Sequence, residues 1–213
     1  MKIILAAVDS RLADAWEQFC GDLDCVTVHR GSIVDLQCDA VVSPANSFGF
    51  MDGGIDALYS DRFGWHVQNR LQELIRDKHH GELLVGAAEI VDTDYSSIPF
   101  VIAAPTMRVP MILKDSVHPY LAARAVLLLI QNGTFAAGPL VGERVFDAVK
   151  SVAFPGLGTG VGRVGPDTCA RQVRAAIDDV INGESSFPHS WTDAQERHQK
   201  LYTDRVRDLQ FGE

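Results

Sequence analysis

The feature that most limits the fold of this chain is a short apolar run that ends in a glycine-bearing loop. Residues 39–42 form the run, Ser43-Pro-Ala-Asn46-Ser-Phe-Gly-Phe-Met-Asp-Gly-Gly54 forms the loop, and an apolar-periodic stretch begins at Ile55. This order predicts a strand, a loop and the start of a helix. The N–H groups at such a junction lack partners and lie at the positive end of the helix dipole, so they suit an anion. An ordinary turn bent by Gly53 and Gly54 is the competing interpretation.

Predicted strands and helices alternate along the chain. We expect strands at residues 2–8, 25–29, 39–42, 86–91, 99–103 and 149–154. We expect helices at residues 10–19 with Ser10 as N-cap, at 55–75 with a break at 63–65, at 119–130 and at 166–181. The alternation predicts a largely parallel sheet with helices on both faces. Ligands of such sheets bind outside the carboxyl ends of the strands.

Composition narrows the class of protein. The 213 residues suit one α/β domain with a short extension, and the apolar share of 46% is that of a packed globule. No apolar run approaches the ~20 residues of a membrane helix, so we expect no membrane segment. A net charge of −9 argues against a nucleic-acid partner, which requires a basic stripe.

The four cysteines, Cys20, Cys25, Cys38 and Cys169, form no C-x-x-C pair. A disulfide framework is therefore not expected in a chain of this length. Asp9 and Arg11 cut short the apolar stretch at residues 1–8, which is not typical of a signal peptide, so we expect a cytoplasmic protein. The seven histidines show no metal-ligand spacing. We expect neither a metal site nor a cofactor.

A second glycine-rich loop follows the last predicted strand. Its sequence is Pro155-Gly-Leu-Gly-Thr-Gly-Val-Gly-Arg163. It lacks the Gly-Lys-Ser/Thr ending of a Walker A loop, and it comes too late in the chain for a dinucleotide fingerprint. Alone it is a weak signal. Both glycine loops follow strands, however, and are expected at the same edge of the sheet.

The two loops together resemble those of the macro domain family, the modules that bind ADP-ribose. The resemblance rests on Gly31-Ser-Ile33, on residues 39–46, on Gly53-Gly-Ile-Asp56 and on Gly158-Thr-Gly-Val-Gly162, and it covers about residues 26–182. It is closest to bacterial and phage-encoded members. It implies a three-layer α/β/α fold with a mixed, mostly parallel central sheet.

The resemblance also implies roles for particular residues. The amides of Gly53, Gly54 and Ile55 would hold the phosphate near the distal ribose, with Ser32 and Ile33 at the adenine. The second loop would hold the diphosphate through Gly158, Thr159, Gly160, Val161 and Gly162. Asn46 and Asp56 match residues that orient the terminal ribose and a water in hydrolytic members. From the residues alone, Asn46 equally suits a loop-stabilising turn, and Asp56 a first-turn aspartate favoured by the helix dipole.

Three positions depart from the family pattern. Ser32 stands where the family usually has an aspartate that accepts from the adenine amino group, which would alter base preference. Gly162 stands where an aromatic often packs on the ribose, and Phe48, Phe50 or Arg163 could compensate. Ser43 replaces a first asparagine of many hydrolases, and Asp52 adds a carboxylate beside the phosphate loop, which is unfavourable unless it points to solvent.

Two further segments have distinct compositions. Residues 105–119 hold three prolines and are predicted to form a long loop, in which Arg108 either reaches a phosphate or is solvated. The chain turns polar from residue 184. We therefore expect a macro-like domain at 1–183 and a helical extension at 184–213. The extension would pack on the domain through Trp191, Leu201, Tyr202, Val206 and Leu209.

Three functions are compatible with the sequence. The first is a hydrolase that removes ADP-ribose from a carboxylate or processes ADP-ribose derivatives, with an ADP-ribosylated protein as partner. The second is a module that binds ADP-ribose or a related nucleotide without turnover. The third is a phage structural protein that keeps the fold without the ligand.

Overall fold

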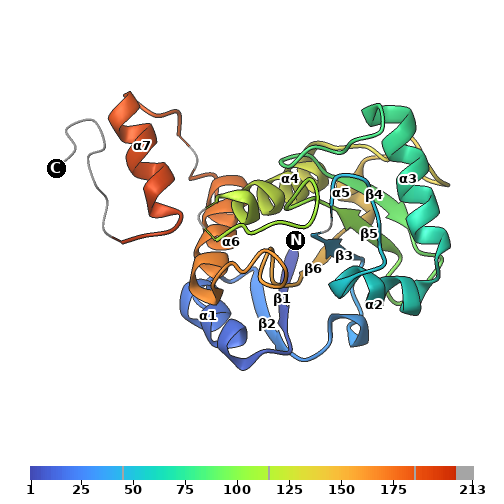
Figure 1. The fold of residues 1–213 in the computed structure, drawn as a ribbon, viewed down its shortest axis with the longest axis horizontal. Coiled ribbons are helices and arrows are strands. Elements are labelled where there is room, and N and C mark those ends of the chain that lie inside the picture. The colour runs from blue at the N-terminus through green and yellow to red at the C-terminus, as the bar shows by residue number, and fades with distance from the viewer. Residues whose placement is uncertain (45, 115, 185, 205–213) are drawn as a thin grey trace.

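The computed structural model contains a six-stranded sheet between two layers of helices (Figure 1). The structure describes residues 1–44, 46–114, 116–184 and 186–204. The strands are β1 (Lys2–Ala7), β2 (Val26–Arg30), β3 (Ala40–Ser43), β4 (Glu89–Asp92), β5 (Phe100–Ala103) and β6 (Ser151–Phe154). Their order in the sheet is β2-β1-β6-β3-β5-β4. Only the edge strand β4 runs antiparallel to its neighbour, so the sheet is mixed and mostly parallel, as predicted.

The helices lie on both faces of the sheet. They are α1 (Ser10–Cys20), α2 (Gly54–Phe63), α3 (His66–His79), α4 (His118–Asn132), α5 (Val145–Ala148), α6 (Pro166–Val180) and α7 (Trp191–Lys200), with a 3₁₀ turn η1 (Ile33–Asp35). Neighbouring strand residues point to opposite faces, which gives two separate cores. Ile3 and Leu5 of β1 belong to the core beneath α1, α4 and α6, whereas Ile4 and Ala6 face α2 and α3.

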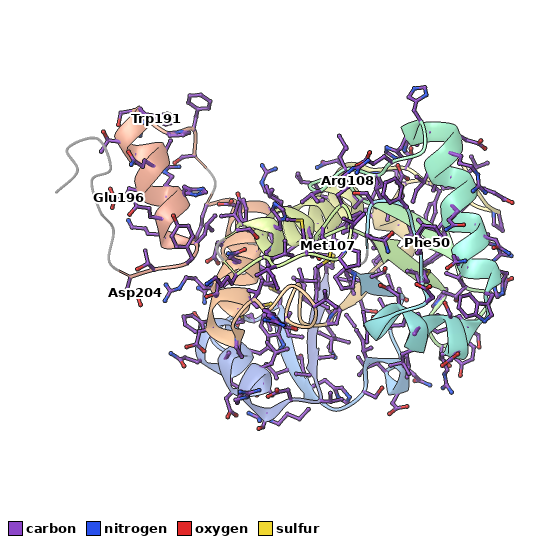
Figure 2. All side chains as sticks on the ribbon, viewed as in Figure 1. Phe50, Met107, Arg108, Trp191, Glu196 and Asp204 are labelled. Atoms are coloured by element: carbon purple, nitrogen blue, oxygen red, sulfur yellow. The ribbon has the colours of Figure 1, made fainter. Side chains whose placement is uncertain are left out.

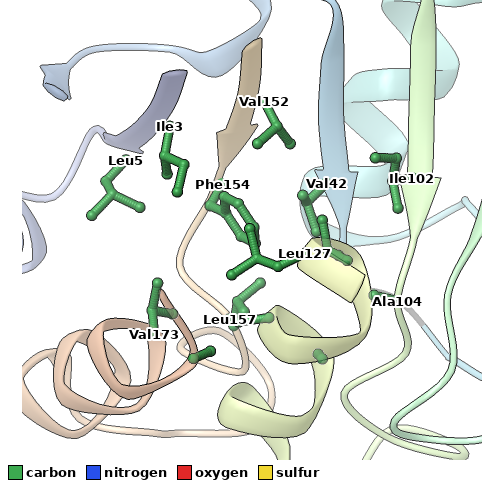
Figure 3. Close-up of a cluster of buried hydrophobic side chains, with 14 of the residues drawn as sticks. Ile3, Leu5, Val42, Ile102, Ala104, Leu127, Val152, Phe154, Leu157 and Val173 are labelled. Atoms are coloured by element: carbon green, nitrogen blue, oxygen red, sulfur yellow. The ribbon is translucent and has the colours of Figure 1, made fainter. Parts of the chain in front are cut away.

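The larger core fixes the end of β6 from which the second glycine loop starts. Phe154 is fully buried, with Leu127 of α4 and Leu157 of the loop beside it (Figure 3). Because Leu157 belongs to this core, the loop that contains it begins from a rigid base.

The predicted elements are present, with differences at particular ends. The helix predicted from residue 55 is broken at Gly64, as expected, and Pro119 and Pro166 stand in the first turns of α4 and α6. The N-cap of α1 is Asp9 rather than Ser10, because the Asp9 carboxylate accepts the N–H of Arg11. The short helix α5 was not predicted.

The segment after residue 184 forms α7, which lies at one side of the molecule beyond α6 (Figure 1). An ion pair of 2.8 Å joins Asp204 to Arg171 of α6. Trp191, expected to pack on the domain, is 71% exposed and lies at the end of α7 away from the sheet (Figure 2). Tyr202 packs edge-on against His198. Val206 and Leu209 lie outside the described residues.

Two features are absent from the described residues. None of their helices is long and apolar enough to cross a bilayer. Within the same residues, no three His, Cys, Asp or Glu side chains gather in a way that would hold a metal ion. The four cysteines are free thiols.

Candidate functional site

A cavity of about 470 Å³ lies at the carboxyl ends of the parallel strands. Strands β2, β1, β6, β3 and β5, which are neighbours in the sheet, each contribute residues that follow the strand. The residues for which the family resemblance implies a ligand-binding or catalytic role all line this one cavity: Ser32, Ile33, Asn46, Gly53, Gly54, Ile55, Asp56, Gly158, Thr159, Gly160, Val161 and Gly162. The topology therefore brings two segments from the first sixty residues together with a third that lies about a hundred residues further along the chain.

The first wall of the cavity is the start of α2. Gly53 is the N-cap, and its carbonyl accepts the N–H groups of Asp56 and Ala57. Within the described part of the chain, the N–H groups of Gly53, Gly54 and Ile55 donate to no carbonyl or side chain. A β-carbon at Gly53 or Gly54 would meet no atom within 4 Å. These residues line the cavity, and no side chain at Gly53 or Gly54 keeps a phosphate away from their amides.

The second wall is the loop after β6. Gly158 adopts φ 68°, and its carbonyl accepts the N–H of Val164, which closes the loop into a tight arch. Among the described residues, the N–H groups from Thr159 to Gly162 have no acceptor. Gly162 lies against Gly158, because a β-carbon there would sit 2.5 Å from the Gly158 oxygen. An aromatic at this position would require the backbone to move.

Asp56 lies at the base of the first wall and is only 5% exposed. The hydroxyl of Ser43, at the end of β3, donates a hydrogen bond of 2.5 Å to its Oδ1 atom. Burial raises the pKa of Asp56 to about 7, and the Ser43 hydrogen bond opposes that rise. This carboxyl group can therefore gain or lose a proton near neutral pH, as a general acid or base must. The sequence identifies Asp56 as a candidate catalytic residue, but it does not predict the hydrogen bond from Ser43.

Asn46 lines the cavity, but its side chain is engaged with its own loop. Its Oδ1 atom accepts the N–H groups of Phe48 and Phe50 at 3.1 and 3.2 Å, and its Nδ2 donates to the Phe50 carbonyl at 2.9 Å. The loop-stabilising interpretation therefore holds in this structure. One N–H of the side-chain amide is left for a ligand.

The cavity contains carboxylates and lacks side-chain cations. Asp9, Asp52 and Asp56 line it, whereas no Lys, Arg or His of the described residues does. The carboxylate of Asp9 is occupied by Arg11, which lowers the pKa of Asp9 through hydrogen bonds. Asp52 is exposed, which is the orientation in which it least opposes an anion. Backbone amides are thus the donors available to an anionic ligand.

Arg108 does not reach the cavity. Its guanidinium pairs with Glu82 through contacts of 2.7 and 3.2 Å and lies over the ring of Phe48. The suggestion that Arg108 contacts a phosphate is therefore wrong for this structure. Neither Phe48 nor Arg163 lines the cavity, whereas Phe50 does and is left as the aromatic that can compensate for Gly162.

The proline-containing loop supplies lining residues that the sequence did not identify. Thr106, Met107 and Pro110 face the cavity. The Thr106 hydroxyl donates to the Pro44 carbonyl at 2.8 Å, and Met107 pairs with Asn46. A long loop between β5 and α4 is expected at the ligand edge of the sheet, but no motif marks these three residues.

Comparison with known proteins identifies one family. A family model described as Macro domain matches residues 42–173. An uncharacterized protein of Aquifex aeolicus is 31% identical over 155 residues, which are 73% of this chain and 80% of that protein. A macro domain-containing protein of Caldanaerobacter subterraneus is 25% identical over 84% of this chain and 94% of its own length.

Solved structures show the same fold. The macrodomain of DarG from Mycobacterium tuberculosis has a TM-score of 0.55 at 19% identity, over 70% of this chain and 87% of that one. An Oceanobacillus iheyensis macrodomain mutant with ADPR has a TM-score of 0.56 at 19% identity, over 70% of this chain and 74% of that one. These TM-scores show that the chain shares the three-layer fold. At identities this low, the similarity shows the fold alone.

Proposed function

Because this chain belongs to the macro domain family, we propose that its cavity binds ADP-ribose or a closely related nucleotide. One observation carries the proposal. The unpaired amides of residues 53–55 and of residues 159–162 line the same cavity from two walls. Two such walls suit the two charged groups of a diphosphate. The solved macrodomain with ADPR supports the choice of ligand by its fold.

Size and charge support the same ligand. A cavity of about 470 Å³ lies within the usual range of small-molecule sites. The chain carries a net charge of −9, and no described Lys, Arg or His lines the cavity. Side-chain cations therefore do not attract the anion to this site. Neutral amide donors can bind a diphosphate without adding charge to the protein.

Calorimetric titration with ADP-ribose, beside AMP, ADP and NAD, tests the binding proposal. We expect ADP-ribose to bind with a Kd of about 1 μM or tighter, ~8 kcal/mol or more, and more tightly than AMP. Equal affinity for all four ligands, or no binding, would contradict it. Tight binding would also count against a purely structural phage protein.

We further propose that the site hydrolyses the bond between ADP-ribose and a carboxylate. Asp56 accepts a proton from a water whose oxygen attacks C1″ of the distal ribose. The C1″–O bond to the carboxylate then breaks, and ADP-ribose and a free carboxylate are released. Support comes from the burial of Asp56 and its pKa of about 7, which suit a general base at neutral pH.

Turnover of an ADP-ribosylated glutamate peptide by wild type, Asp56→Asn and Asp52→Asn tests the hydrolase proposal. We expect Asp56→Asn to lose about 10²-fold or more of kcat. Asp52→Asn removes an exposed carboxylate of the same cavity and should retain most of kcat. Equal turnover by wild type and Asp56→Asn would remove Asp56 from the mechanism.

A binding module without turnover is the second candidate. The engagement of the Asn46 side chain by Phe48 and Phe50 favours it, because that amide is less free to orient a ribose. Multiple-turnover release of ADP-ribose would exclude this candidate. In either case the free thiols of the four cysteines support the cytoplasm as the compartment.

A further inference from the structure

Residues 109–112, Val-Pro-Met-Ile, connect the two glycine loops across the cavity; we call them the apolar strap. Before the strap, the carbonyl of Arg108 accepts the N–H of Ser47 in the first loop at 3.2 Å. After it, the N–H of Leu113 donates to the Gly162 carbonyl of the second loop at 2.7 Å. Leu113 is buried. The strap is therefore held at both ends by the loops proposed to bind the diphosphate.

All four strap residues are exposed, although all four are apolar. Val109, Met111 and Ile112 are each about half exposed, and Pro110 lines the cavity. Four further apolar side chains line the cavity and remain exposed: Val8, Phe50, Leu58 and Val161. A contiguous set of exposed apolar side chains at the mouth of a binding site is typical of an interaction surface.

The strap lies at the end of the cavity where the proposed reaction takes place. Met107, three residues before Pro110, pairs with Asn46, and the Asn46 side chain holds the backbone of Phe50. Figure 2 shows Phe50 and Met107 on the body of the molecule. Phe50 and Pro110 thus line the same cavity as Asn46 and Asp56, the two residues proposed to act at the distal ribose.

The charged residues around the cavity limit which class of molecule can bind at the apolar strap. Among the described residues, the cavity lining has carboxyl groups at Asp9, Asp52 and Asp56 and no cation, and Asp9 is paired with Arg11 beside the cavity. The nearby Arg108 is already paired with Glu82. A nucleic acid would bring phosphates next to carboxylates, without the basic residues that bind its backbone. A polypeptide segment with apolar or basic side chains suits this surface.

We propose that the apolar strap and Phe50 form a docking surface for the polypeptide that carries the ADP-ribosyl group, and that they select apolar residues flanking the modified one. This inference rests on the proposed function and extends it. The nucleotide is held by the two amide walls, and the flanking side chains of the carrier bury the strap. Recognition of the substrate thus reaches beyond the nucleotide to the sequence around the modified residue.

The test uses stable conjugates, so that binding is measured without turnover. ADP-ribose is joined by a thioglycosidic bond to a cysteine flanked by leucines, to the same peptide with glutamates in place of the leucines, and to a DNA oligonucleotide. Each conjugate and free ADP-ribose are titrated against wild type, against the triple variant Val109→Ser, Met111→Ser, Ile112→Ser, and against Val141→Ser. Val141 is 63% exposed and lies outside the cavity lining, so it is a matched control.

We expect wild type to bind the leucine conjugate about tenfold more tightly than the glutamate conjugate, the effect of burying one or two apolar side chains. The triple variant should lose that preference and keep its affinity for free ADP-ribose, and Val141→Ser should change neither. Equal affinity for the two peptides, with free ADP-ribose bound, would overturn the docking proposal alone. Tighter binding of the DNA conjugate would also overturn it. So would a dimeric wild type together with a monomeric triple variant, because the strap would then bind a second copy of this chain. Failure to bind free ADP-ribose would overturn the proposed function itself.

Discussion

Ser43 and Asp56 lie thirteen positions apart in the chain and share a hydrogen bond of 2.5 Å beneath the proposed phosphate loop. Ser43 is fully buried and Asp56 is 5% exposed. Burial makes the carboxylate form costly, and the Ser43 hydroxyl recovers part of that cost because it donates to the charged oxygen. The pair thus sets the pH at which Asp56 can act as a base.

The buried Asp56 should make the protein less stable as pH rises. Its pKa is about 7 in the folded protein and 3.8 ordinarily, so between these values the folded state holds a proton that the unfolded state has released. The free energy of unfolding of wild type should therefore fall, relative to Asp56→Asn, by about 1.4 kcal/mol per pH unit across that window. Urea unfolding of both proteins at several pH values measures the difference. A difference that stays constant with pH would contradict the raised pKa.

Removing the Ser43 hydroxyl should raise the pKa of Asp56 further. The acidic limb of the kcat/KM profile of Ser43→Ala should move to higher pH, because Asp56 would lose its proton later. Ser60→Ala is the matched control, since its buried hydroxyl donates to the Met51 carbonyl and not to Asp56. Both variants should lose about 1 to 3 kcal/mol of stability. Identical shifts in the two profiles would show that the Ser43 contact does not set the pKa.

A side chain at Gly53 should block the ligand without disturbing the fold. Gly53 has φ −140°, which suits valine, and a β-carbon there meets no atom within 4 Å. We expect Gly53→Val to bind ADP-ribose at least about tenfold more weakly, with an unchanged Tm. Gly165→Val is the control, because Gly165 also has open space around it but lies outside the cavity lining. Equal losses of affinity in both variants would argue against a phosphate at Gly53.

The second loop should tolerate a β-carbon at Gly160 but not at Gly162. At Gly162 the β-carbon would lie 2.5 Å from the Gly158 oxygen and 3.0 Å from Leu113, whereas at Gly160 it would meet nothing within 4 Å. Gly162→Ala should cost about 1 to 3 kcal/mol of stability, and Gly160→Ala close to none. Thermal unfolding measures both. The reverse order would mean that the arch of this loop differs from the one described.

The sequence predicted the sheet, its layers and the cavity because these follow from patterns within short segments. Gly64, for example, has φ 102° and ends α2 where the helical periodicity breaks. The four-residue helix α5 is too short to have a period of its own, so the sequence pattern does not reveal it. The choice of Asp9 over Ser10 as N-cap is a shift of one residue, which periodicity does not resolve.

Contacts between side chains that are distant in the sequence could not be predicted from the sequence pattern. The sequence left open that Arg108 reaches a phosphate, but its guanidinium is paired with Glu82, twenty-six residues earlier. The rotamer of Asn46 turns its amide into the loop, and only the folded loop determines that direction. Trp191 was predicted to pack on the domain as part of the helical extension, yet it is exposed.

The most direct test of the account is an NMR titration of backbone amides with ADP-ribose. We expect the amide signals of Gly53, Gly54 and Ile55 to shift together with those of Thr159 to Gly162, along one binding curve. The amides of Gly142 and Gly183, which lie outside the cavity lining, should not shift. Shifts confined to one loop, or located elsewhere on the chain, would contradict the claim that the two glycine loops hold the diphosphate between them.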